Sequence, residues 1–453
     1  MNTLSTLLSA IVLLAAAALA PAQDLTRTAP EQSAPVFLVG AEVHTVSGEV
    51  IPDGVVAFND GVITLVGRRA DVMPRINLSP DSRVIDATGH RVYPGLIASN
   101  TRLGLTEIGA VRATHDYNET GPLTPEVTPA VSVNPDSTLI PVARSNGILT
   151  FASVPSGGRV PGALSVMRAE GWTWEDMTIA RRAGIVLSWP NMRPAYRAFP
   201  GANTPADPAE AVAAIDALFT RAQAYDALRR ADDNAPIDIR MESMRNLFAE
   251  AASQQIPLFI NANDIDQIRA AVTWAAARGL KAVIVGGRDA PLVSDLLVAH
   301  DVPVVLSGTH TWPKRADSPH DDPFTLPKRL ADAGVTFAID TSDRDGNVRN
   351  LPYETARSAA FGLDPAHALR SITLDAAAIL GVADQLGSID RGKRATLLVT
   401  EGDILEVTTN IKHAFVDGRE IDLTNKQTEL RDKYREKYRQ LGTIPAQDEA
   451  ANQ

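Results

Sequence analysis

Cysteine is absent from the 453 residues of this sequence. The chain therefore forms no disulfide, has no thiolate for nucleophilic or metal chemistry, and offers no residue to which a bacterial lipid anchor could be attached. Histidine is also sparse, at 8 residues. Stability must come from a packed core rather than from cross-links.

The chain has no excess of positive charge either. The chain has 43 Lys and Arg against 54 Asp and Glu, a net charge of −11, and no block of basic residues. We therefore expect no nucleic-acid partner. Hydrophobic residues make up 45% and charged residues 21%, an ordinary globular balance. The length allows one large domain and a smaller one.

The first 22 residues read as a cleavable signal peptide. Leu7 to Ala20 is an apolar run too short for a comfortable stop-transfer span, and it ends in the small-x-small pattern Ala20-Pro21-Ala22. Met1-Asn2-Thr3 lacks the usual Lys or Arg. A membrane anchor would need a longer span and charged flanks. We expect cleavage before Gln23, no stable membrane span, and a periplasmic or secreted bacterial protein.

Both ends of the remaining chain are rich in short β patterns. Residues 23–90 begin with a polar lead-in to Pro35, expected to be disordered, and continue with alternating strands and the hairpin signal Asn59-Asp60-Gly61. Residues 383–423 contain matching strand patterns. We predict that the two ends together form one small β-sandwich.

Residues 91–382 alternate strand-like and helical runs. The predicted strands are Gly95–Ser99, Gly147–Ser153, Ala163–Met167, Ile185–Trp189, Pro257–Asn261, Ala282–Val285, Val302–Leu306 and Thr336–Ile339. Eight strands separated by helices, such as Asp264–Arg278 and Pro208–Arg230, predict a (β/α)₈ barrel, and hence an α/β fold. Residues 424–453 read as a charged helix and tail, lying on the surface or on a partner subunit of a homo- or hetero-oligomer.

Three segments closely resemble the amidohydrolase superfamily. The first is Val92–Gly104, a Pro-Gly turn followed by an apolar strand and a polar run. The others are the closing helix pattern Ala366–Gly381 and the return Gly387–Val399, in which Thr396 stands where the family usually has Asp. The resemblance spans nearly the whole mature chain. It implies hydrolysis of a carbon–nitrogen bond other than a peptide bond in a small-molecule substrate, by water bound to a metal, usually zinc.

The residues at the family's metal positions differ from its pattern. Where the family has two histidines after the first strand, this chain has Asn100 and Arg102. Asn261 and Arg288 stand at or beside the histidine positions after the fifth and sixth strands, and Ser188-Trp189-Pro190 offers no Lys or Glu after the fourth. After the eighth strand acids remain, with Asp343 the better match to the catalytic Asp and Asp340 close behind.

These substitutions predict that the inherited metal centre, and with it the zinc cofactor, is lost. An amide oxygen is a weaker zinc ligand than imidazole, and a guanidinium repels a dication. The arginines either replace the metal's charge, pairing with Asp343 or a substrate carboxylate, or form an internal salt bridge in the vacated site; we favour the second. A metal held by His310 and His320 from one loop remains an alternative, although their spacing matches no recognised ligand pattern.

Three functional hypotheses follow. The chain hydrolyses a carbon–nitrogen bond through an altered site in which Asp343 and Asp340 are catalytic and Asn100, Arg102, Asn261 and Arg288 contact substrate. Alternatively, it is catalytically inactive and serves as a ligand-binding or partner subunit of an active amidohydrolase. The third hypothesis is hydrolysis by the paired carboxylates Asp340 and Asp343.

Overall fold

The computed structural model describes residues 28–76, 78–193, 207–341 and 344–444. Residues 28–423 form one compact unit, and residues 424–444 belong to a second, which is considered by itself. The predicted signal peptide, residues 1–22, lies outside the described residues.

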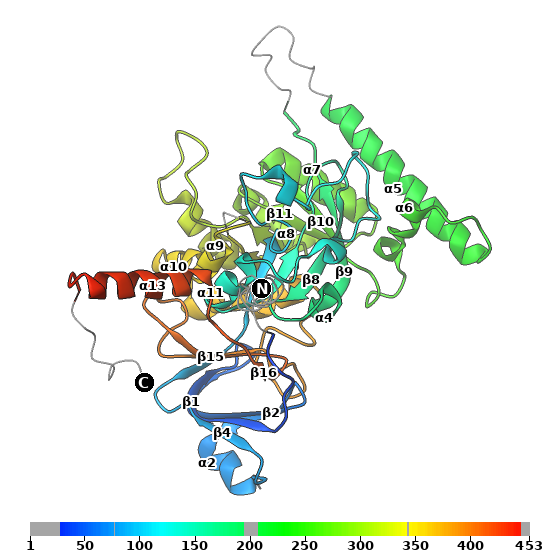
Figure 1. Cartoon of the computed structure of the whole chain (residues 1–453). Coiled ribbons are helices and arrows are strands. Elements are labelled where there is room, and N and C mark those ends of the chain that lie inside the picture. The colour runs from blue at the N-terminus through cyan, green and yellow to red at the C-terminus, as the bar shows by residue number, and fades with distance from the viewer. Residues whose placement is uncertain (1–27, 77, 194–206, 342–343, 445–453) are drawn as a thin grey trace, which may run out of the picture. The chain divides into compact units, whose positions relative to one another are not determined.

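Strands from both ends of the chain form one eight-stranded sheet, sheet A (Figure 1). Its strands are β1 (Val36–His44), β2 (Val50–Asn59), β3 (Val62–Arg68), β4 (Arg83–Asp86), β5 (Arg91–Pro94), β14 (Leu397–Thr400), β15 (Ile411–Val416) and β16 (Arg419–Glu420). Their order is β16-β15-β14-β5-β1-β2-β3, with β4 paired to β1. The antiparallel pairing of β14 with β5 joins the two ends, as the sequence predicted.

The polar lead-in is more ordered than expected. The Ala29 main-chain N–H donates to Glu170 Oε1 at 2.8 Å, and the Gln32 side chain donates to Phe58 O at 3.0 Å. These bonds attach residues 28–35 to the barrel and to sheet A. Their partners lie far away in sequence, so the local pattern gave no sign of them.

A second eight-stranded sheet forms a nearly closed barrel between these ends. Its strands are β6 (Leu96–Thr101), β7 (Ile148–Ser153), β8 (Gly162–Arg168), β9 (Thr178–Ser188), β10 (Leu258–Ala262), β11 (Ala282–Gly286), β12 (Val304–Leu306) and β13 (Phe337–Ile339). They follow one another in chain order across the sheet. All eight predicted strands are present, and the predicted fold class is confirmed.

One strand departs from a regular (β/α)₈ pattern. β8 runs antiparallel to both β7 and β9, whereas the neighbouring pairs from β9 to β13 and the pair β6–β7 are parallel. A loop of eight residues, 154–161, joins β7 to β8 without a helix. Such a loop suits neighbouring antiparallel strands, because a parallel connection needs a longer crossover.

Helices cover the outside of the barrel (Figure 1). The helices of this unit are α2 (Arg69–Val72), α3 (Leu139–Arg144), α4 (Trp174–Met177), α5 (Pro208–Ala231), α6 (Ile239–Glu242), α7 (Ile265–Ala277), α8 (Ser294–Ala299), α9 (Asp322–Asp332), α10 (Leu351–Ala360), α11 (Pro365–Ser371) and α12 (Leu374–Ile379). α7 begins as predicted after Asp264, whose N–H donates to the Gln267 side chain at 3.2 Å.

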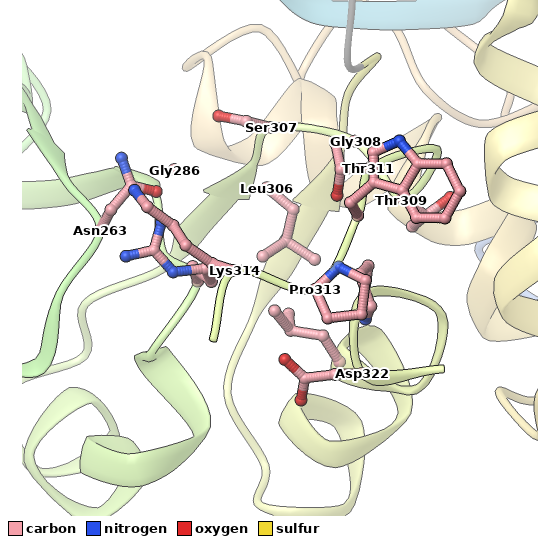
Figure 2. A pocket seen from close by; sticks show the side chains of 14 residues that line it. Asn263, Gly286, Leu306, Ser307, Gly308, Thr309, Thr311, Pro313, Lys314 and Asp322 are labelled. Carbon is pink, nitrogen blue, oxygen red and sulfur yellow. The ribbon is translucent and has the colours of Figure 1, made fainter. Parts of the chain in front are cut away.

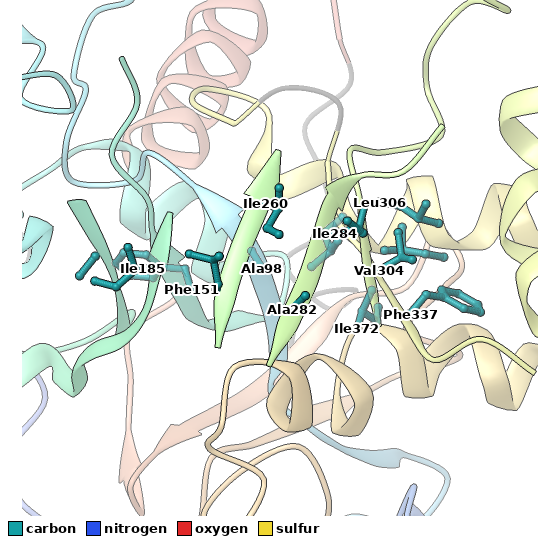
Figure 3. Packing of buried hydrophobic residues seen from close by; sticks show 14 of the residues in the cluster. Ala98, Phe151, Ile185, Ile260, Ala282, Ile284, Val304, Leu306, Phe337 and Ile372 are labelled. Atoms are coloured by element: carbon teal, nitrogen blue, oxygen red, sulfur yellow. The ribbon is translucent and has the colours of Figure 1, made fainter. Parts of the chain in front are cut away.

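Alternate strand residues pack into two different clusters. Ile260, Ile284, Val304 and Phe337 share the large cluster that includes residues of α5, α7 and α9 (Figure 3). Their neighbours Phe259, Val283, Val305 and Ala338 share the other cluster, with residues of α12. This period of two places the second cluster inside the barrel and the first between the strands and the outer helices.

The second unit contains α13 (Lys426–Gln440). The Asn425 side chain accepts hydrogen bonds from the N–H groups of Gln427 and Thr428 at 2.9 and 3.2 Å, which caps the helix start. The predicted charged helix is therefore present. In the part of the chain that the structure describes, no helix combines the length and the apolar character needed to cross a membrane.

Candidate active site at the barrel edge

The parallel strands end at one edge of the barrel, the edge where barrels of this architecture carry their active sites. Asn261 and Asp340 continue the inner series of side chains two residues beyond Phe259 and Ala338. Both therefore lie at the inside of this edge. Asn100 lies near the end of β6 and is 6% exposed.

An arginine that the sequence analysis did not single out contacts Asn100. Arg344 donates from Nη2 to Asn100 Oδ1 at 2.6 Å and from Nε to Asn100 O at 3.0 Å. The Arg102 main-chain N–H donates in turn to Arg344 O at 2.8 Å. Burial lowers the pKa of Arg344 to about 10, and the nearby Arg102 charge acts in the same direction. Three hydrogen bonds thus tie the segment after β13 to the end of β6.

Arg102 makes polar and aromatic contacts of its own. Its Nη2 donates to Ser156 Oγ at 3.2 Å, and its Nη1 lies 3.6 Å from Asp345 Oδ2. The guanidinium carbon lies 4.0 Å from the centroid of the Tyr117 ring. These contacts fix the charge of Arg102 beside that of Arg344, so two cations stand near the positions where the family pattern has histidines.

Asp340 is a fully buried acid at this edge. It is 0% exposed, and its Oδ1 accepts the Thr341 N–H at 2.8 Å. Its Oδ2 is buried without a hydrogen-bond partner among the described residues. Burial raises the pKa of Asp340 to about 7, Glu354 acts in the same direction, and Arg344 opposes it. A carboxyl of this pKa can accept and release a proton at neutral pH.

The other predicted site residues lie apart or outside the description. Asp343 is one of the two residues, 342 and 343, between Thr341 and Arg344 that the structure does not describe. Asn261 accepts the Trp189 main-chain N–H on its own carbonyl at 3.2 Å. Arg288 forms an ion pair with Asp264, and its Nε lies 3.9 Å from Asp289 Oδ1. The structure thus brings Asn100 and Arg102 together with Asp340 through Arg344, but places Arg288 in a different cluster.

The donors at this edge do not fit a divalent metal. The amide oxygen of Asn100 already accepts a hydrogen bond from Arg344, and Arg102 presents a guanidinium, which cannot ligate a cation. Over the described ranges, no group of three or more His, Cys, Asp or Glu side chains is placed to hold a metal ion. His310, on the loop after β12, donates its main-chain N–H to Glu354 Oε2 at 3.2 Å.

Arg344 was missed because its partner Asn100 is 244 residues away. The sequence signal that could have identified it is a cation directly following the acids after the eighth strand. In a site expected to lose its metal, an adjacent arginine is a natural source of replacement charge.

Comparisons with known proteins fit this architecture. Residues 219–421 match the model of the amidohydrolase family. The matched range includes Asp340 and the return into sheet A, whereas Asn100 and Arg102 precede it.

The curated relatives that cover most of this chain are distant in sequence. An imidazolonepropionase of Symbiobacterium thermophilum is 25% identical over 389 residues, covering 77% of this chain and 84% of the relative. That of Mesorhizobium japonicum is 23% identical over 385 residues, covering 77% and 87%. Among solved structures, an amidohydrolase from Thermotoga maritima superposes with a TM-score of 0.74 at 23% identity, covering 85% of this chain and 99% of the other. The structural likeness establishes the fold.

Proposed function

We propose that this protein hydrolyses a carbon–nitrogen bond other than a peptide bond, in a small-molecule substrate, at the barrel edge formed by β6 and β13. Family membership of the matched domain and the names of the distant relatives support this reaction class. The observation that carries the proposal is Asp340, a buried acid at the end of β13 whose pKa burial raises to about 7.

In this mechanism Asp340 activates the attacking water without the help of a metal. Its carboxylate accepts a proton from a water that attacks the substrate carbonyl carbon, and the carbon–nitrogen bond breaks as that proton passes to the leaving nitrogen. Arg344 and Arg102 stabilise the negative charge that develops on the carbonyl oxygen. Asn100 positions Arg344 through its two hydrogen bonds, at 2.6 and 3.0 Å. Asp343 is a second candidate for the proton acceptor, by its place in the family pattern.

The test is turnover of a panel of cyclic and acyclic amides, including imidazolone propionate, by metal-free protein. The expected result is hydrolysis that survives chelation and falls at least about a hundredfold in Asp340→Asn or in Asp343→Asn. Asp317→Asn, an exposed acid on the loop after β12, is the matched control and should keep full activity. Activity that disappears on chelation and returns with zinc would refute the metal-free mechanism.

A catalytically inactive role is the second candidate, because specific contacts favour it. Arg344 bonds Asn100, Arg102 contacts Asp345 and Ser156, and Asp340 is 0% exposed, so this protein's own side chains fill the site. Such a chain would bind a ligand or join an active amidohydrolase in a mixed oligomer. It predicts no turnover on any amide, and a stable mixed oligomer on co-expression with a histidine-bearing family member encoded nearby.

We propose that the protein is exported through the inner membrane of a bacterium and is periplasmic or secreted. The support is the apolar run Leu7–Ala20 and the small residues before Gln23. Mass spectrometry of protein from the periplasmic fraction should give a mature chain that begins at Gln23. A full-length chain in the cytoplasmic fraction would contradict this assignment.

A further inference from the structure

A cavity of about 200 Å³ lies beside the end of β12 (Figure 2). Leu306 and Leu326 contribute to its apolar wall, and both belong to the cluster that packs the strands against the outer helices. Asp340 is not among the residues that line the cavity. It is smaller than the ~300–1,000 Å³ pockets that hold drug-sized ligands, so it fits a small molecule.

One wall of the cavity is the segment 307–315, which is held at two places by buried carboxylates. Glu354, 2% exposed, accepts the main-chain N–H of Thr309 at 2.7 Å and that of His310 at 3.2 Å on Oε2. Asp289, also 2% exposed, accepts two bonds from Arg315 at 3.0 and 2.5 Å. The wall is thus fixed before any ligand arrives, which lowers the entropic cost of binding.

The residues that line the cavity include two cations, Arg288 and Lys314, and one acid, Asp322, so one cation is in excess in the lining. Arg288 is paired with Asp264, and Asp322 is paired with Arg329. Lys314 lines the cavity and forms no ion pair within the described part of the chain. An anionic ligand would neutralise this surplus charge.

Two further groups at the cavity offer hydrogen bonds. Arg288 lines it, and its Nε–H is buried without a hydrogen-bond partner among the residues described. The Asn263 carboxamide occupies the space that a side chain at Gly286 would fill, since a Cβ there would lie 2.6 Å from Asn263 Oδ1.

We propose that this cavity binds a small organic acid. Its carboxylate is held by Lys314 and Arg288, with Asn263 as a further donor, and its apolar body lies against Leu306 and Leu326. The proposal does not rest on the proposed hydrolysis, because the lining contains neither Asp340 nor Arg344.

The test compares phenylacetate with phenylacetamide, which have nearly the same shape but differ in charge, by calorimetry on the full mature chain. The expected result is binding of the acid at least about fivefold tighter than the amide. The preference should disappear in Lys314→Met and remain in Lys314→Arg. Lys328→Met, on α9 but outside the cavity lining, should leave it unchanged.

The fluorescence of Trp312 tests whether phenylacetate binds in this cavity. It lines the cavity and is 92% exposed, so its fluorescence should change with phenylacetate, and this change should be lost in Trp312→Phe while calorimetric binding persists. Equal affinity for acid and amide, no binding of either at millimolar concentration, or an unaltered preference in Lys314→Met would overturn the proposal. If the protein binds phenylacetate as expected but hydrolyses no amide, only the proposed hydrolysis is refuted.

Discussion

Asp340 is the residue on which the proposed chemistry rests, and its burial links the stability of the barrel edge to pH. Its carboxyl group is fully buried, one oxygen accepts the Thr341 N–H, and the other has no hydrogen-bond partner among the residues that the structure describes. A carboxylate in this environment destabilises the folded state, because burial disfavours its charged form. The nearby cation of Arg344 offsets part of this destabilisation, because it favours the charged form and lowers the pKa of Asp340.

Asp340→Asn should therefore change how stability depends on pH. Folding raises the pKa of Asp340 from 3.8 to about 7, so the folded state binds this proton more tightly than the unfolded state does. The contribution of Asp340 to the free energy of unfolding then falls as pH rises from about 4 to about 7, by at most ~4 kcal/mol, and is constant above. Asp340→Asn should flatten this part of the profile in urea unfolding at pH 5 to 8. Asp317→Asn is the control, and an unchanged slope in Asp340→Asn would contradict the assignment.

Arg344→Met should raise the pKa of Asp340 further. It removes both hydrogen bonds to Asn100 and the charge that lowers the pKa of Asp340. We expect a loss of about 1–3 kcal/mol in the free energy of unfolding and a shift of the Asp340 titration to higher pH. Arg349→Met, a few residues further on, tests for nonspecific effects of losing an arginine. A stability profile identical to that of the unchanged protein would mean that Arg344 does not support this edge.

At the scale of elements, the loop between β12 and α9 depends on partners from other parts of the barrel. Glu354 comes from α10, and Asp289 follows β11 and also accepts the Ile265 N–H, at 3.1 Å, at the start of α7. Although burial opposes it, the bonds from Arg315 lower the pKa of Asp289, so this acid stays charged and bound at neutral pH. The loop that forms a wall of the cavity is thus anchored to two neighbouring elements.

Asp289→Asn should loosen this loop without unfolding the barrel. Arg315 would lose its bidentate partner, and we expect a loss of about 1–3 kcal/mol in stability together with faster amide hydrogen exchange over residues 309–315. Asp317→Asn, on the same loop but exposed, should leave exchange unchanged. Equal exchange in both variants would show that Asp289 is not the anchor.

Periodicity and turn residues predicted the elements well but not how they pair. All eight barrel strands were predicted because each is an apolar run bounded by turn signals. The direction of β8 was not predicted, since an alternating pattern is the same for parallel and antiparallel neighbours. The strand β1 continues through Gly40, which at φ +86° bends it at a bulge without ending it, and the local pattern did not predict this bulge.

At the scale of the whole molecule, the fold and the site were predictable to different degrees. The joining of both chain ends in sheet A followed from the family resemblance and the β patterns. The chemistry of the edge depends on contacts such as Arg344 with Asn100, across 244 residues, which no local pattern contains. The loss of the metal centre, inferred from Asn100 and Arg102, stays a prediction, and the sequence did not indicate that Arg344 contacts Asn100.

The central claim is that arginine side chains have replaced the family's metal at the barrel edge. The most direct test is elemental mass spectrometry of the purified mature chain, without a histidine tag, combined with the amide hydrolysis assay. We predict a folded protein with far less than one zinc or other transition metal per chain, and with properties that do not change on chelation. About one metal per chain, lost together with an amide-hydrolysing activity and restored with it, would contradict the claim.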